Sequence, residues 1–126
     1  MRLNNNKIRR VTMGKMLNEF NAYRDKMNQK ILSEDNKAVK RFFSVDTITY
    51  QPGALDVKTK EMMGLATSMV LRCDDCVKYH IIKCHENGVT KDEFFEIFSV
   101  ALVVGGSIVV PHMRRAVEFL EEFFED

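Results

Sequence analysis

The chain has 126 residues, of which 45% are hydrophobic and 29% charged, and this size and composition fit one globular domain over residues 1–126. Its formal net charge of +1 gives no field strong enough to indicate binding to nucleic acid or to an anionic membrane. We therefore expect a small molecule or another protein as its partner. The basic segment at residues 1–10 is not followed by an apolar run, so we expect no signal peptide and a cytoplasmic location.

Two helices are predicted in the first part of the chain. In the first, apolar residues recur at steps of three and four and form one stripe, at Met16, Phe20, Tyr23, Met27 and Ile31. The second runs from near Asn36 to Tyr50 and ends before Pro52, because proline cannot continue the helical hydrogen bonding.

Four more helices are predicted after Gly53. The third covers residues 57–72, begins at a capping Asp56, and is so apolar that it should lie deep in the fold. The fourth covers a cysteine-rich stretch and stops at Gly88, since glycine readily takes the left-handed conformation that ends a helix. Thr90 and Glu93 have the spacing of a capping box and begin the fifth. The last follows Gly106, with apolar residues at Val110, Met113, Val117, Leu120 and Phe124.

The predicted fold class is all-α, with about six helices, because no segment shows a clear strand-like alternation of apolar and polar residues. The longest apolar stretch, residues 97–110, is too short to span a bilayer, which requires roughly 20 apolar residues. The third and fifth helices are too apolar to be covered by the other helices of one copy. We therefore predict a homo-oligomer in which they are buried between subunits.

The stretch RCDDCVKYHIIKCHENG, residues 72–88, holds all three cysteines and two of the three histidines. On a helical wheel of about 100° per residue, four of these side chains share one face: Cys73, Cys76, His80 and Cys84. His85 points elsewhere. Cys73 and Cys84 lie about 16 Å apart along a continuous helix, so at most two or three of the four could bind one zinc ion. Valine follows the second cysteine, which excludes a c-type haem site. We expect no metal and no cofactor.

A redox role suits the same spacing. Two thiols one turn apart at a helix start can close a disulfide, and the helix dipole stabilises a thiolate there. His80, one turn after Cys76, can take its proton. Asp74 and Asp75 oppose this, since their negative charges disfavour a thiolate between them. The alternative is that the cysteines are small buried apolar residues, which we expect for Cys84.

One spacing joins this stretch to the preceding helix. Glu61, eleven residues, Cys73-Asp74-Asp75-Cys76, three residues and His80 resemble the Glu-x11-Cys-x2-Cys-x3-His signature of alkylhydroperoxidase D-like proteins, within the carboxymuconolactone decarboxylase family. The sequence from Ala54 to Gly106 as a whole looks like the core sequence of that family.

The resemblance implies an all-helical fold, assembly into trimers or hexamers, and thiol-dependent reduction of peroxides or disulfides. It implies that Cys73 and Cys76 are the redox pair and that His80 and Glu61 form a proton relay. The decarboxylase branch of the family lacks the cysteine pair, which argues against a lactone decarboxylase. The chain departs from the family pattern at Asp75, where an aromatic residue or histidine is common, and at Cys84, where a small residue is usual.

The prediction is thus a thiol-dependent peroxidase or disulfide reductase that uses a thiol electron donor. Cys76 attacks and Cys73 resolves, although the opposite assignment stays open. The alternatives are a redox-sensing or stress-response module without peroxidase turnover, and a lactone decarboxylase-type enzyme. We assign structural roles to His85 and His112. For His112 alone, an approach to the site across a subunit boundary is left open. Arg114 and Arg115 are expected to be solvent or interface charges, with substrate binding by an arginine left open.

Overall fold

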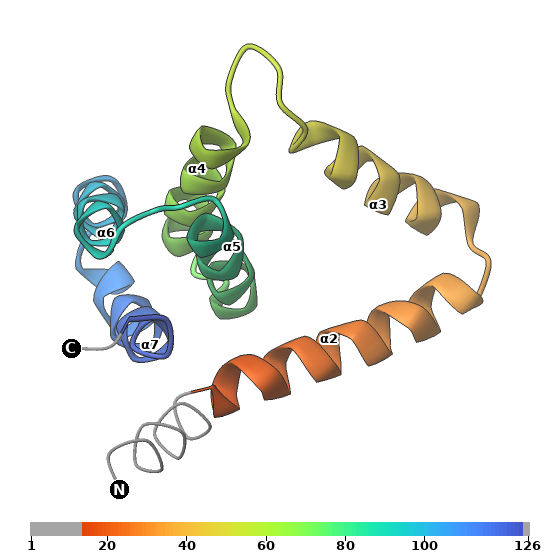
Figure 1. Ribbon diagram of the computed structural model, residues 1–126, viewed down its shortest axis with the longest axis horizontal. Helices are drawn as coiled ribbons and strands as arrows, with labels where there is room; N and C mark the ends of the chain where they lie inside the picture. The colour runs from red at the N-terminus through yellow and green to blue at the C-terminus, as the bar shows by residue number, and fades with distance from the viewer. Residues whose placement is uncertain (1–13, 125–126) are drawn as a thin grey trace, which may run out of the picture. The chain divides into compact units, whose positions relative to one another are not determined.

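The structure, a computed structural model, describes residues 14–124, and the basic segment at residues 1–10 lies outside the described residues. Its secondary structure consists of six α-helices and one 3-10 helix, without a strand among the described residues (Figure 1). The predicted all-α class is confirmed. No helix within residues 14–124 is long and apolar enough to cross a membrane.

The chain divides into two compact units, the first ending at Gln51 and the second beginning at Pro52. Whether the two units act as a single domain stays a prediction. The second unit contains all the candidate site residues predicted from the sequence.

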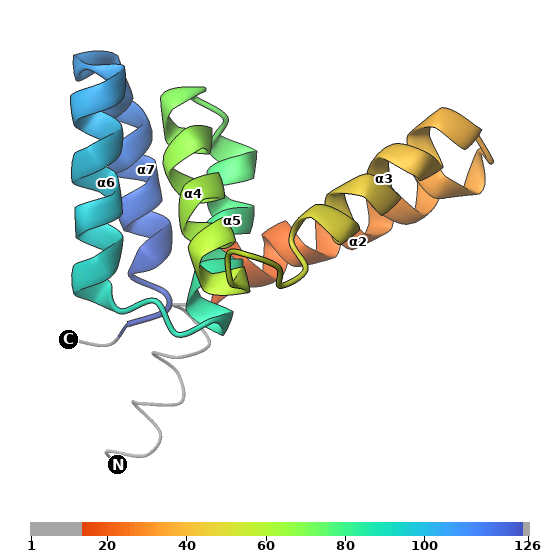
Figure 2. The ribbon, with the colours of Figure 1, turned by 90° about the horizontal axis from the view of Figure 1, so that it is seen from above.

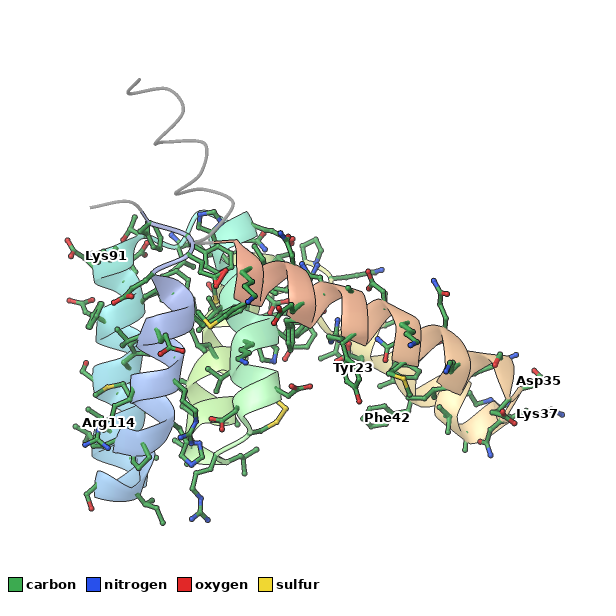
Figure 3. The ribbon with its side chains drawn as sticks, turned by 90° about the horizontal axis from the view of Figure 1, so that it is seen from below. Tyr23, Asp35, Lys37, Phe42, Lys91 and Arg114 are labelled. Atoms are coloured by element: carbon green, nitrogen blue, oxygen red, sulfur yellow. A yellow bond between two sulfur atoms is a disulfide. The ribbon has the colours of Figure 1, made fainter. Side chains whose placement is uncertain are left out.

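The first unit contains α2 (Lys15–Ser33) and α3 (Lys37–Thr49). Asn36 caps α3, because its side chain accepts a hydrogen bond of 3.1 Å from the Val39 amide. Within the described chain, neither helix buries a single residue. Tyr23 and Phe42 are 67% and 73% exposed and project from the two helices (Figure 3). The apolar stripe predicted for the first helix is only partly covered, with Met16, Phe20 and Met27 half-buried and Tyr23 and Ile31 exposed.

The second unit is a bundle of four α-helices and one short 3-10 helix, seen end-on in Figure 1 and from the side in Figure 2. Its elements are α4 (Val57–Val70), α5 (Asp74–Glu86), α6 (Lys91–Gly105), η1 (Ser107–Val109) and α7 (Val110–Leu120). Helix α4 packs against α5 and α6, and α5 packs against α7. The largest fully buried side chains are Phe94, Phe98, Phe119, Leu65, Met69 and Ile81.

The capping residues predicted from the sequence are confirmed. The Asp56 side chain accepts a 2.7 Å hydrogen bond from the Thr59 amide at the start of α4. Thr90 and Glu93 form both hydrogen bonds of a capping box at the start of α6. The carboxylate of Glu93 also lies 3.1 Å from Lys58 Nζ, which joins the first turn of α6 to the first turn of α4.

Two predicted helix boundaries are wrong. The third helix ends at Val70 instead of residue 72, because Arg72 adopts a left-handed conformation with φ of 61°. After this turn the Cys73 amide donates to the Ser68 carbonyl at 3.1 Å, so Cys73 precedes α5 and is not part of a continuous helix. The last helix ends at Leu120, which leaves Phe124 beyond it.

Candidate active site

Cys73 and Cys76 are joined by a disulfide at the start of α5, with their Cα atoms 5.2 Å apart. Cys73 is the N-cap residue, and its Sγ accepts a hydrogen bond of 3.2 Å from the Cys76 amide. Cys76 is exposed and Cys73 is partly buried. The pair therefore lies at the protein surface, where the amides and the dipole of a helix N-terminus stabilise a thiolate.

A buried ion pair or hydrogen bond links α4 to α5 one turn beyond the disulfide. His80 Nδ1 lies 2.8 Å from Glu61 Oε2, and the two residues are only 8% and 3% exposed. A glutamate is seldom buried unless it has a partner, and here that partner is the imidazole. When Nδ1 carries the hydrogen and donates it to Glu61, Nε2 is the basic nitrogen of the ring. The structure thus brings together the two residues for which the family resemblance implied a proton relay.

Cys84 is the third cysteine on this side of α5, and it is fully buried. Burial, together with the negative charge of Glu61, raises the pKa of its thiol to about 12. A thiol that stays protonated is a poor nucleophile. The expectation that Cys84 is a small buried residue agrees with this environment.

Asp74 is held by two residues of α7, a cluster that the sequence analysis missed. Its Oδ1 lies 2.7 Å from His112 Nδ1, and its Oδ2 accepts a 2.9 Å hydrogen bond from Arg115 Nε. Burial alone would raise the pKa of Asp74, but the hydrogen bonds to His112 and Arg115 and the Arg115 charge lower it overall. Asp74 is therefore a carboxylate whose charge is balanced from α7.

This cluster adds to two expectations. His112 contacts Asp74 within its own chain, and Arg115, which is exposed as expected for a surface charge, also donates to the carboxylate that follows Cys73. The three-residue spacing of His112 and Arg115 places them on one face of α7, which was visible in the sequence. Only the packing of α7 on α5 shows what that face meets.

Three other polar residues of this region lie apart from these contacts. The His85 ring packs on Phe123 and Phe124, with centroid distances of 4.9 Å and 5.4 Å, so its predicted orientation away from the cysteines is confirmed. Arg114 is exposed and projects from α7 (Figure 3), as expected for a surface charge. Asp75 is exposed as well. Within residues 14–124, no three His, Cys, Asp or Glu side chains are grouped so that they could hold a metal ion.

Comparison with known proteins gives one family and several relatives. The sequence model of the carboxymuconolactone decarboxylase family matches residues 36–121. A 4-carboxymuconolactone decarboxylase of Acinetobacter baylyi is 27% identical over 88% of the chain and 80% of its own length. An uncharacterised protein of the cox locus of Paracoccus denitrificans is 26% identical over 64% of the chain and 73% of its own length.

Two relatives have solved structures. A Thermotoga maritima protein of the same family, with a suggested part in the antioxidative response, is 55% identical and superposes with a TM-score of 0.79 over 82% of this chain and 88% of its own. A family member from Legionella pneumophila is 25% identical, with a TM-score of 0.77 over 86% of this chain and 96% of its own.

Proposed function

We propose that this chain, which belongs to the carboxymuconolactone decarboxylase family and resembles its alkylhydroperoxidase D-like members, is a thiol-dependent peroxidase or disulfide reductase. The observation that carries the proposal is the disulfide of Cys73 and Cys76 at a helix N-terminus, next to the buried pair of Glu61 and His80. The suggested antioxidative part of the Thermotoga maritima relative supports the same chemistry.

In the oxidative half-reaction His80, oriented by Glu61, takes the proton of the Cys76 thiol, which lies one helical turn away. The Cys76 thiolate attacks one peroxide oxygen, the O–O bond breaks, and Cys76 becomes a sulfenic acid. The leaving alkoxide takes the proton from His80 and departs as an alcohol. Cys73 then attacks the Cys76 sulfur, which forms the disulfide and releases water. The exposure of Cys76 gives a peroxide access to it.

In the reductive half-reaction a thiol donor attacks the disulfide and forms a mixed disulfide, which a second donor thiol resolves. Over one full cycle, one peroxide and two donor thiols thus give one alcohol, one water and one oxidised donor, and the two protein thiols are regenerated. A protein or small-molecule disulfide accepts the same two electrons if the chain works as a disulfide reductase.

The test measures peroxide consumption in the presence of a dithiol reductant. We expect the wild-type protein and Cys84→Ala to be active, and Cys76→Ser to be inactive. Cys84→Ala is the matched control, because it also removes one thiol from α5 but leaves the disulfide pair intact. Equal rates for the wild type and Cys76→Ser contradict a peroxidase that works through this thiol.

A second candidate is a lactone decarboxylase, and it is favoured by one observation, the 27% identity to the Acinetobacter baylyi decarboxylase. That activity needs no thiol pair, so it should survive the double substitution Cys73→Ser and Cys76→Ser.

A third candidate is a redox sensor. It is favoured if every peroxide is turned over slowly while oxidation of the disulfide pair reversibly changes the assembly of the protein.

A further inference from the structure

The cluster of Asp74, His112 and Arg115 lies next to the disulfide and takes no part in the proton relay. Asp74 directly follows Cys73 and is the first residue of α5, so its carboxylate belongs to the first turn of the helix that Cys73 caps. A carboxylate at this place disfavours the Cys73 thiolate, because like charges repel. The two hydrogen bonds from α7 bring a guanidinium, and an imidazole that can be protonated, to the same carboxylate.

We propose that His112 and Arg115 are positioning residues for the redox pair, which hold Asp74, compensate its charge and so favour the thiolate form of Cys73 in the reduced protein. The proposal rests on the proposed function, since it assigns these residues to the same dithiol. It accounts for the acidic residue after Cys73, which by itself opposes thiol chemistry.

The arrangement has the features that such a role requires. Arg115 meets Asp74 Oδ2 while His112 meets Oδ1, so the carboxylate is fixed at both oxygens. Arg115 Nη2 also lies 3.2 Å from His112 Nδ1, but an Nδ1 that donates its hydrogen to Asp74 cannot accept one here, so the shared carboxylate is what holds the two α7 side chains together. The other charged residues near Cys73 in the chain are Arg72, directly before it, and Asp75, two residues after it. Glu61 of α4 carries a further negative charge, but this carboxylate is bound to His80, which lies one helical turn after Cys76 in α5.

The expected effect is modest, because the side chains of Asp74 and Arg115 are 40% and 52% exposed and solvent screens them. It is measured on full-length protein with Cys76→Ser and Cys84→Ala, which leaves Cys73 as the sole thiol of the chain. The rate of alkylation by iodoacetamide at neutral pH then reports the thiolate fraction of Cys73.

In this background we expect Arg115→Gln to slow alkylation about two- to fivefold, and Asp74→Asn to accelerate it by a similar factor. Changes of opposite sign in the alkylation rate distinguish an effect of charge from a general loosening of the packing between α5 and α7. Arg115→Lys, which keeps the charge, should stay closer to the wild-type rate than Arg115→Gln. The double substitution of Asp74→Asn with Arg115→Gln should return the rate towards that of the parent protein.

Arg114→Gln is the matched control, since it removes the same charge from the neighbouring, exposed position of α7. Equal rates for Arg115→Gln and Arg114→Gln overturn the proposal, and so does a change of the same sign for Arg115→Gln and Asp74→Asn. The result is independent of peroxide turnover. If turnover is absent but the alkylation pattern holds, the proposed function fails and the positioning role stands. If turnover is normal but the substitutions at Arg115 and Asp74 leave the alkylation rate unchanged, the positioning role fails and the proposed function stands.

Discussion

Glu61 of α4 and His80 of α5 meet at 2.8 Å between two packed helices, where both are almost completely buried. This relationship ties the chemistry of the site to the packing of the bundle. The residue that orients the base is also a polar group that the core can hold only while its partner is present. Substitutions at Glu61 should therefore separate the two roles.

Glu61→Gln and Glu61→Ala are expected to differ in stability and to agree in activity. Alanine removes the hydrogen bond between the carboxylate and the buried imidazole and should lower the free energy of unfolding by about 1–3 kcal/mol. Glutamine can keep a hydrogen bond and should cost less. Both should lower peroxide turnover by at least about tenfold, because the carboxylate that stabilises a protonated His80 is gone. Urea denaturation and a peroxide assay measure the two effects.

Glu118→Gln is the control for this pair of variants, because it makes the same change at an exposed position of α7. It should affect neither stability nor turnover. Full turnover by a folded Glu61→Gln protein would show that the carboxylate has no part in the relay.

Cys84 should make the stability of the protein depend on alkaline pH. Its pKa is raised from 9.0 to about 12 in the folded chain, chiefly by burial, so between these values the unfolded thiol ionises while the folded thiol keeps its proton. The unfolded state then binds fewer protons, and the free energy of unfolding falls as pH rises through this window, by at most about 1.4 kcal/mol per pH unit. Below about pH 9 the contribution is constant.

Cys84→Ala removes this thiol, so the comparison isolates the contribution of Cys84 from that of every other group in the chain. Urea denaturation at a series of alkaline pH values, without reductant, should show a steeper decline for the wild type than for Cys84→Ala. Parallel declines of the two proteins would mean that the Cys84 thiol is not kept protonated by the fold.

Gly105 should resist substitution because of a single close approach. A Cβ atom added there would lie 2.5 Å from Cγ2 of Val109, a fully buried residue that cannot move away easily. We expect Gly105→Ala to lower the free energy of unfolding by about 1–3 kcal/mol through overpacking. Combined with Val109→Ala, which makes room, it should cost less than the sum of the two single changes, as measured in a double-mutant cycle by urea denaturation. Simple additivity would rule out this contact as the cause.

Helix α6 should be part of the interface of the proposed homo-oligomer, a trimer or hexamer. Four of its apolar side chains are 45% to 87% exposed in one copy, namely Phe95, Val100, Val103 and Val104. Val103→Glu places a charge at the most exposed of them and should shift the sedimentation of the protein towards smaller species. Glu118→Lys, a charge change on exposed α7 surface, should leave the assembly intact. A wild-type protein that sediments as a monomer at micromolar concentration would contradict the prediction.

Local features of the sequence determined the helices and the core of the candidate site. Asp56 and Thr90 cap the helices that follow them, because a cap depends only on hydrogen bonds to amides within the next turn. Cys73, Cys76 and His80 are brought together by α5 and the residue that caps it, so their spacing in the chain is enough to place them near each other. The place of Glu61 could not be predicted from local spacing, because its contact with His80 joins two helices. It was expected only from the resemblance to a family.

Tertiary structure alone decided the surroundings of Asp74, the first of the two acidic residues between Cys73 and Cys76. Asp74 lies 38 residues from His112 and 41 from Arg115 in the chain, and no local pattern joins such distant positions. The left-handed turn at Arg72, which ends α4 early and makes Cys73 a cap, was equally hidden, because arginine carries no preference for that conformation. Helical periodicity shows which face of α7 is polar. Only the packing of α7 against α5 determines that this face meets Asp74 next to the disulfide.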